Sequence, residues 1–245
     1  MNKPQRAGAL TAPLIHADRL FPADIASRTV ARRLYAEVRD LPIISPHGHT
    51  DPRWYAEDAP FPDPATLFVI PDHYIFRMLH SQGIALETLG IPPLSGEPAA
   101  FDPRTVWRLF AENYVLFRGT PTRMWLDHVF ATLFGFDERL SGKNADHYFD
   151  RIGEALATPA FRPRALFERF NIEAIATTDS PLDDLKHHHA LKASGWSGRV
   201  VPAYRPRAAP RRLTRVRSMP SWLVSETSRL RHSIASRGAW ITGRG

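Results

Sequence analysis

Residues 41–51 read LPIISPHGHTD, an apolar run that ends in two histidines one residue apart. Ile43 and Ile44 predict a buried strand. Because side chains alternate along a strand, His47 and His49 are expected at its end and on the same side. Two neutral imidazoles placed side by side can hold one divalent metal ion. This stretch therefore predicts a metal-binding site at the end of a strand in an α/β protein.

The histidine pair also has a simpler interpretation, in which two loop histidines precede a helix. Asp51 is then either a hydrogen-bond acceptor for one imidazole or an ordinary turn residue. The chain has no cysteine, which excludes a thiolate zinc site and a disulfide framework. Any metal must therefore be held by histidine, aspartate or glutamate. The lack of cysteine and of a signal-peptide core in the first twenty residues fits the cytoplasm.

A second strand signal begins at residue 172, where the sequence IEAIATTD runs from apolar to polar residues. Ser180 can cap a following helix, which is expected to reach about Ser194. The segment 198–205, GRVVPAYR, predicts another short strand. The order strand, helix, strand is typical of a right-handed parallel βαβ unit, and such folds place their sites at the carboxyl ends of the strands.

Polar residues at these strand ends have both functional and structural interpretations. Residues 177–180 could line a site or only cap the helix. Arg205 could bind a substrate carboxylate through its guanidinium fork, or it could form a surface ion pair. The residues of His187–His189 occupy three consecutive helical positions that cannot share one face, so solvent exposure is expected for them and metal binding is not.

Helical patterns dominate the rest of the chain. One amphipathic segment covers residues 24–39, and prolines interrupt further helices over 73–79, 103–117, 121–134, 145–156 and 164–170. Asp72 is expected to cap the helix that begins at His73. His73 and Tyr74 then lie in its first turn, where they could hydrogen-bond a polyol or carry a proton. Aromatic residues at helical spacing are expected in the core: Trp107, Phe110, Phe117, Trp125, Phe130 and Phe134.

The basic charge of the chain is confined to its C-terminal segment. The total is +7, and residues 207–245 hold nine arginines, no lysine and one glutamate, a net charge of +8. The preceding residues therefore carry a net charge of −1. The segment contains no recognisable nucleic-acid-binding module, so a nucleic-acid partner is only an alternative interpretation. No apolar stretch approaches the roughly 18 residues of a membrane span, and no membrane partner is expected.

Five short motifs follow one another along the chain: ARRLY at 31–35, H-x-H at 47–49, DHY at 72–74, TTDSP at 177–181 and VPAYRP at 201–206. Taken in this order, they resemble the motifs of uronate isomerase, also called glucuronate isomerase, a family of the amidohydrolase superfamily. The resemblance implies an α/β fold, a distorted (β/α)8 barrel with a large helical insertion after its first strand. It implies an aldose–ketose isomerisation that converts D-glucuronate to D-fructuronate and D-galacturonate to D-tagaturonate.

The same resemblance implies roles for individual residues. His47 and His49 would hold the family's divalent metal, often zinc. His73 and Tyr74 would contact the open-chain sugar and take part in catalysis, and Arg205 would bind the sugar carboxylate. Moving a proton between C2 and C1 through a cis-enediol requires an acid–base pair and stabilisation of charge on oxygen, which a metal can supply. The expected partner is a small sugar acid, and an oligomer is left open.

The resemblance also divides the chain into segments. Only three strands are recognised, so the expected fold is the N-terminal part of the barrel with the C-terminal strands missing. The change of composition after residue 206 predicts a shift of reading frame there, with little isomerase turnover. The alternatives are another amidohydrolase-type metal hydrolase and a non-catalytic remnant. The segments are a lead-in helix and first strand at 1–51, the insertion at 52–170, strands two and three with their helix at 171–206, and an aberrant Arg- and Ser-rich segment at 207–245.

Overall fold

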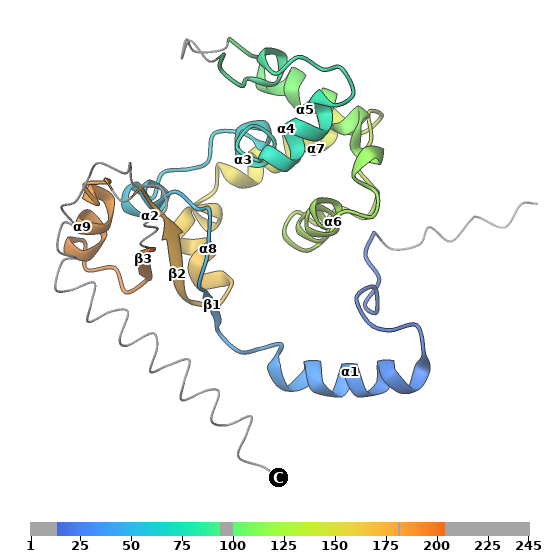
Figure 1. Cartoon of the computed structure of the whole chain (residues 1–245), viewed down its shortest axis with the longest axis horizontal. Helices are drawn as coiled ribbons and strands as arrows, with labels where there is room; N and C mark the ends of the chain where they lie inside the picture. Colours follow the sequence, from blue (N-terminus) through green and yellow to red (C-terminus); the bar gives the residue numbers. More distant parts are fainter. Residues whose placement is uncertain (1–13, 94–99, 181, 204–245) are drawn as a thin grey trace, which may run out of the picture. The chain divides into compact units, whose positions relative to one another are not determined.

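The computed structural model describes residues 14–93, 100–180 and 182–203 (Figure 1). Internal contacts divide the chain into two compact units. A helical unit comprises residues 1–37 and 61–158, and a sheet unit comprises residues 38–60 and 159–245, each over its described residues. Within the described ranges, no helix combines the length and the apolar character that crossing a membrane requires.

The sheet unit is built on three parallel strands, β1 (Ile43–Ser45), β2 (Ile172–Thr178) and β3 (Arg199–Ala203). Their order in the sheet is β1-β2-β3, and the strand–helix–strand unit predicted from residue 172 onward is confirmed. The short β1 begins where the Ile43 N–H donates to the Asn171 carbonyl oxygen at 2.9 Å. The carboxyl ends of all three strands therefore lie at one edge of the sheet.

Three helices cover the sheet: α2 (Pro52–Glu57), α8 (Pro163–Arg169) and α9 (Lys186–Ala193). Each of these helices contributes one side chain to a hydrophobic core that also includes side chains of β2 and β3. Trp196 packs against this core, and its ring is stacked on the ring of Tyr55. Arg164 joins α8 to α2, because its Nε donates to the Tyr55 carbonyl oxygen at 2.8 Å. The buried members of this core are Tyr55, Phe167, Ile175, Leu191 and Val200.

Two expectations for this unit are wrong in detail. Ile43 is 50% exposed, because β1 is a three-residue strand at the edge of the sheet. The helix after β2 begins at Lys186 and not next to Ser180. The Ser180 hydroxyl and the Asp184 carboxylate each accept a hydrogen bond from a backbone N–H two residues ahead, which favours successive turns over helix. Leu185, with φ of 57°, then precedes the first helical turn.

The helical unit owes its regular elements to local capping signals. Proline occupies the first turn of α3 (Pro64–Phe68), α5 (Pro103–Glu112) and α6 (Pro121–Leu133). The residues before these prolines, Asp63, Asp102 and Thr120, accept hydrogen bonds from backbone N–H groups of that turn. The helices of this unit are α1 (Ile25–Val38), α3 (Pro64–Phe68), α4 (His73–His80), α5 (Pro103–Glu112), α6 (Pro121–Leu133) and α7 (Ala145–Leu156). Short 3-10 helices cover Glu87–Leu89 and Tyr114–Phe117. A third 3-10 helix, Pro159–Phe161, precedes α8 in the sheet unit.

Aromatic side chains form the core of the helical unit, as predicted. Trp107 is completely buried, and its indole N–H donates to the Ala145 carbonyl oxygen at 2.9 Å, which joins α5 to α7. Phe130 of α6 packs edge-on against Trp107 and Tyr148. Trp125, however, is 54% exposed, so its expected place in the core is wrong. The helix α1 is confirmed, but none of its side chains is buried.

Candidate functional site

The two histidines of the H-x-H motif converge just beyond the end of β1. Their Nε2 atoms are 3.0 Å apart, with ring centroids separated by 4.9 Å. Gly48 between them anchors the segment, since its N–H donates to the Ala176 carbonyl oxygen at 2.8 Å and its own carbonyl accepts from the Thr178 hydroxyl. A Cβ on Gly48 would lie 3.2 Å from that Ala176 oxygen, so glycine suits this close approach to β2.

This separation fits two ligands of one metal ion. Two nitrogens bound to a tetrahedral zinc at about 2.0–2.1 Å lie about 3.3 Å apart, close to the observed Nε2–Nε2 distance. Without a metal, one Nε2–H can donate to the bare Nε2 of the other ring, and metal binding replaces this hydrogen bond. Among the residues that the structure describes, no group of three or more histidine, cysteine, aspartate or glutamate side chains is arranged so that it could hold a metal ion. The distance between the two Nε2 atoms is thus compatible with two ligands of a metal site.

A pocket of about 440 Å³ opens beside His49 at the carboxyl end of β2. Its lining is rich in carboxylates and imidazoles, which suits a hydroxylated or cationic ligand. The expectation that polar groups gather at this edge of the sheet is borne out for residues 178–180. The lining residues are His49, Thr50, Asp51, Pro52, Thr178, Asp179, Ser180, Asp183, Asp184, Lys186, His187 and His188.

Asp51 acts as the N-cap of α2, which agrees with the turn interpretation of this residue. Its Oδ1 accepts a hydrogen bond from the Arg53 backbone N–H at 2.8 Å, and Oδ2 lies 3.8 Å from the Arg53 Nε. This hydrogen bond and this ion pair join the residue at the end of the H-x-H segment to the first turn of α2. Asp51 therefore shapes the pocket rim through the backbone.

A buried hydrogen-bond network behind the pocket was not predicted. Thr177 is completely buried, and its hydroxyl donates to Asp179 Oδ2 at 2.6 Å. The same hydroxyl oxygen lies 2.9 Å from His188 Nε2, which must then carry the proton and donate. Nδ1 of His188 is buried without a hydrogen-bond partner among the described atoms. The network fixes the position of Asp179, whose side chain is only 8% exposed, at the pocket.

The expectation that His187–His189 are solvated is wrong for the middle residue. His188 is only 2% exposed, because it shares the inner face of α9 with Leu191, three positions later. That spacing was the available sequence signal. Burial lowers the pKa of His188, and the negative charges of Asp179 and Asp183 oppose this effect only in part.

Acidification is expected to destabilise the sheet unit through His188. Because its pKa is lowered in the folded chain, His188 stays neutral there, while the unfolded chain takes up a proton near pH 6.5. The contribution of neutral His188 to the free energy of unfolding is fully present above about pH 6.5. This contribution is lost as the pH falls toward the pKa of His188 in the folded chain. The other ionisable groups close enough to affect the charge of His188 are Asp179, Asp183, His187 and His189.

Thermal unfolding followed by circular dichroism at a series of pH values measures this effect. The loss of stability between about pH 7 and about pH 5.5 should be smaller in His188→Asn than in the original chain, with His187→Asn as the matched control. An equal loss in His188→Asn and the original chain would show that His188 is not the titrating group.

His73 and Tyr74 lie, as predicted, in the first turn of α4, and both side chains are exposed. Asp72 is the N-cap, with its Oδ1 accepting from the Tyr74 N–H at 2.8 Å. The His73 and Tyr74 rings lie 4.2 Å apart between centroids. They belong to the helical unit, whereas the histidine pair belongs to the sheet unit. Arg205 lies outside the described residues.

Comparison with known proteins identifies the family. A family model described as glucuronate isomerase matches residues 21–223, which extends beyond the last recognised motif. A uronate isomerase of Phenylobacterium zucineum is 66% identical over 198 residues, covering 80% of this chain and 41% of the relative. A uronate isomerase of Rhizobium meliloti is 62% identical over 195 residues, again covering 80% of this chain and 42% of the relative.

Solved structures agree. The crystal structure of glucuronate isomerase from Caulobacter crescentus matches with a TM-score of 0.75 and 60% identity, over 80% of this chain and 41% of that one. A uronate isomerase from Thermotoga maritima matches with a TM-score of 0.67 and 26% identity, over 78% and 39% of the two chains. The chain thus spans about two fifths of the length of the relatives it matches. Because the family match covers most of its residues, the chain belongs to the glucuronate isomerase family.

Proposed function

We propose that this chain takes part in the isomerisation of uronates, converting D-glucuronate to D-fructuronate and D-galacturonate to D-tagaturonate. The observation that carries the proposal is the convergence of the His47 and His49 Nε2 atoms in a chain of this family. In this proposal β1, β2 and β3 are the first three strands of a (β/α)8 barrel, residues 52–170 form its insertion, and the enzyme works in the cytoplasm.

His47 and His49 would hold a divalent metal, with zinc as the proposed ion. Both rings are exposed, and their Nε2 atoms face each other. Zinc is bound in proteins by imidazole nitrogen as well as by carboxylate oxygen, so these two atoms suit it. A bound metal supplies Lewis-acid stabilisation of charge that develops on the sugar oxygens. The buried Thr177 hydroxyl donates to Asp179 and so holds this carboxylate in the wall of the pocket that His49 also lines.

The remaining proposed roles concern the sugar. His73 and Tyr74 would contact the open-chain substrate and move a proton between C2 and C1, because an imidazole and a phenol can each donate and accept hydrogen bonds and both side chains are exposed. Arg205 would bind the substrate carboxylate with its guanidinium fork and so orient the reacting carbons. The family match favours this isomerisation over the hydrolysis considered as an alternative.

A chimera tests the proposal independently of chain length. Residues 21–203 of this chain would replace the matching part of the Caulobacter crescentus protein, and conversion of D-glucuronate would be followed by proton NMR in D2O with added Zn²⁺. The chimera should form the ketose. His47→Gln should lower the rate by about a thousandfold or more, because loss of the metal removes several kcal/mol of transition-state stabilisation.

The control is His147→Gln, which removes an exposed histidine of α7 and should leave the rate unchanged. A folded chimera without activity, or one in which His47→Gln turns over as fast as its parent, would contradict the proposal. Folding of each chimera would be checked by circular dichroism before the rates are compared.

A further inference from the structure

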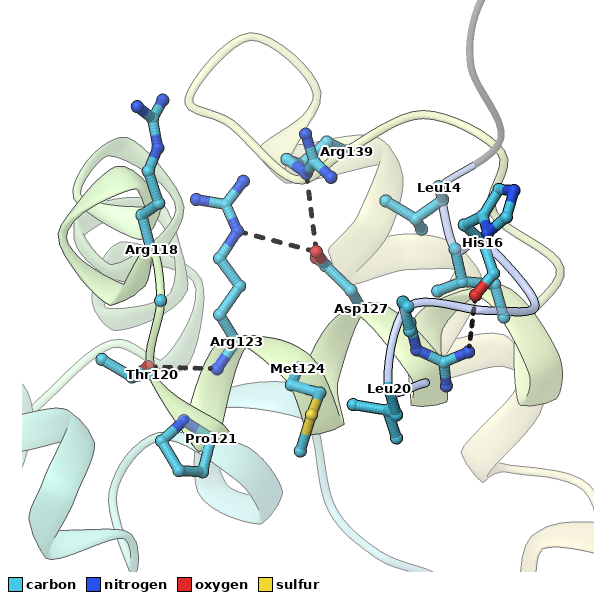
Figure 2. A pocket seen from close by; sticks show the side chains of 13 residues that line it. Leu14, His16, Leu20, Arg118, Thr120, Pro121, Arg123, Met124, Asp127 and Arg139 are labelled. Atoms are coloured by element: carbon cyan, nitrogen blue, oxygen red, sulfur yellow. Dashed lines mark hydrogen bonds and ion pairs between the residues drawn. The ribbon is translucent and has the colours of Figure 1, made fainter. Parts of the chain in front are cut away.

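A second pocket, of about 630 Å³, lies entirely in the helical unit (Figure 2). One wall is the segment 14–20, and the other is formed by residues 118–127 at the start of α6, with Arg139 nearby. The pocket shares no residue with the histidine pair or its neighbouring pocket. Its lining combines apolar side chains with a group of arginines. The apolar members are Leu14, Ile15, Leu20, Pro121 and Met124.

Positive charge exceeds negative charge in this pocket. Four arginines line it, Arg19, Arg118, Arg123 and Arg139, against the single carboxylate of Asp127. Asp127 is already occupied, because its Oδ2 lies 3.6 Å from the Arg123 Nε and 3.5 Å from the Arg139 Nε. Figure 2 shows Asp127 turned toward these two side chains, and Tyr114 donates its hydroxyl to the other carboxylate oxygen at 2.9 Å. The lining keeps a net charge of +3, with histidine neutral.

Among the ion pairs of the described residues, none involves the two other arginines, Arg19 and Arg118. Within the described part of the chain, Arg118 has no ion-pair partner, and Figure 2 shows its side chain extended. Arg19 contacts only neutral groups: its Nη1 donates to the His16 carbonyl oxygen at 3.1 Å, and its Nη2 lies 3.1 Å from His128 Nδ1. Burial, together with the charge of Arg19, lowers the pKa of His128, which favours its neutral form.

The start of α6 adds to the positive potential. This helix has 13 residues, and Gly119, Thr120 and Pro121 at its N-terminal end line the pocket. Thr120 is the N-cap, with its hydroxyl accepting from the Arg123 N–H at 3.3 Å. The dipole of a helix of this length favours an anion at its N-terminus, and the arginines that surround this end reinforce the effect.

We propose that this pocket binds a small organic anion, a molecule with one carboxylate or phosphate group on a body of about monosaccharide size. The unpaired guanidinium groups would hold the oxyanion, and Leu14, Leu20 and Met124 would contact the body of the ligand. The volume of the pocket lies within the range typical of small-molecule sites. The site is independent of the uronate isomerisation proposed above.

Three sugars that differ mainly in charge test the proposal: D-glucuronate, D-glucose 6-phosphate and neutral D-glucose. Binding to the full chain would be measured by isothermal titration calorimetry at low ionic strength, without added metal. At least one charged sugar should bind, D-glucose should not, and added salt should weaken binding. Comparison of the two charged sugars tells whether carboxylate or phosphate is preferred. Equal binding of D-glucose, or no binding of either anion at millimolar concentration, would overturn the proposal.

Single substitutions locate the site. Arg118→Gln should weaken anion binding by about tenfold, since it removes an exposed charge whose loss should not affect folding. Arg33→Gln, which removes an exposed arginine of α1, is the matched control and should have no effect. Binding that survives Arg118→Gln unchanged, or that is lost in His47→Gln instead, would also overturn the proposal. Circular dichroism of each variant would establish that the fold is intact.

Discussion

Replacing Trp107 with alanine should cost about 3–5 kcal/mol of folding free energy, whereas Trp125→Ala should cost less than about 0.5 kcal/mol. Both tryptophans lie in helices of the same unit, α5 and α6. Trp107 is completely buried, and its indole N–H donates to the Ala145 carbonyl oxygen. Its loss leaves a large cavity among Phe110, Phe130 and other rings and removes the partner of a buried carbonyl.

Urea unfolding of the two variants, followed by far-ultraviolet circular dichroism, measures this difference. A loss of this size is a large share of the stability of an ordinary domain, so the urea midpoint of Trp107→Ala should lie well below that of Trp125→Ala. Trp125 is more than half exposed, and its removal creates no cavity. Equal effects of the two substitutions would contradict the packing described for the helical unit.

Zinc affinity should fall by at least about a hundredfold in His47→Gln and in His49→Gln. Each substitution leaves a single imidazole where two Nε2 atoms now converge, so the chelate is lost. Glutamine is a weak ligand of comparable polarity, and both side chains are exposed, which limits the effect on folding. Competition with a chromophoric zinc chelator measures the affinity. The exposed His147, replaced by glutamine, provides the control and should leave it unchanged.

Local sequence signals predicted the elements of the fold well. Proline at the first helical position together with a preceding Asp102 or Thr120 determines where α5 and α6 begin, because both signals act within one turn. The apolar run from Ile172 likewise predicted β2 and its parallel pairing with β3. The convergence of His47 and His49 followed from the alternation of side chains along an extended segment.

Features that depend on distant contacts were not predictable in the same way. The spacing of Trp125 is compatible with either face of α6, and only the packing of its neighbours determines that it faces solvent. The Thr177–Asp179–His188 network joins a strand end to the middle of a helix, and no local signal specifies it. The arginine-rich pocket joins the segment 14–20 to the segment 118–127 and to Arg139, which are far away in the sequence. For Arg205, His73 and Tyr74, the substrate contacts remain predictions.

The proposed site requires one divalent metal ion bound to both histidines of the H-x-H segment. X-ray absorption spectroscopy of the zinc-loaded chain counts the imidazole ligands directly. We expect two imidazoles at about 2.0–2.1 Å from zinc, falling to one or none in His47→Gln and His49→Gln while His147→Gln retains both. A spectrum without imidazole scattering, or one that neither substitution changes, would contradict the account.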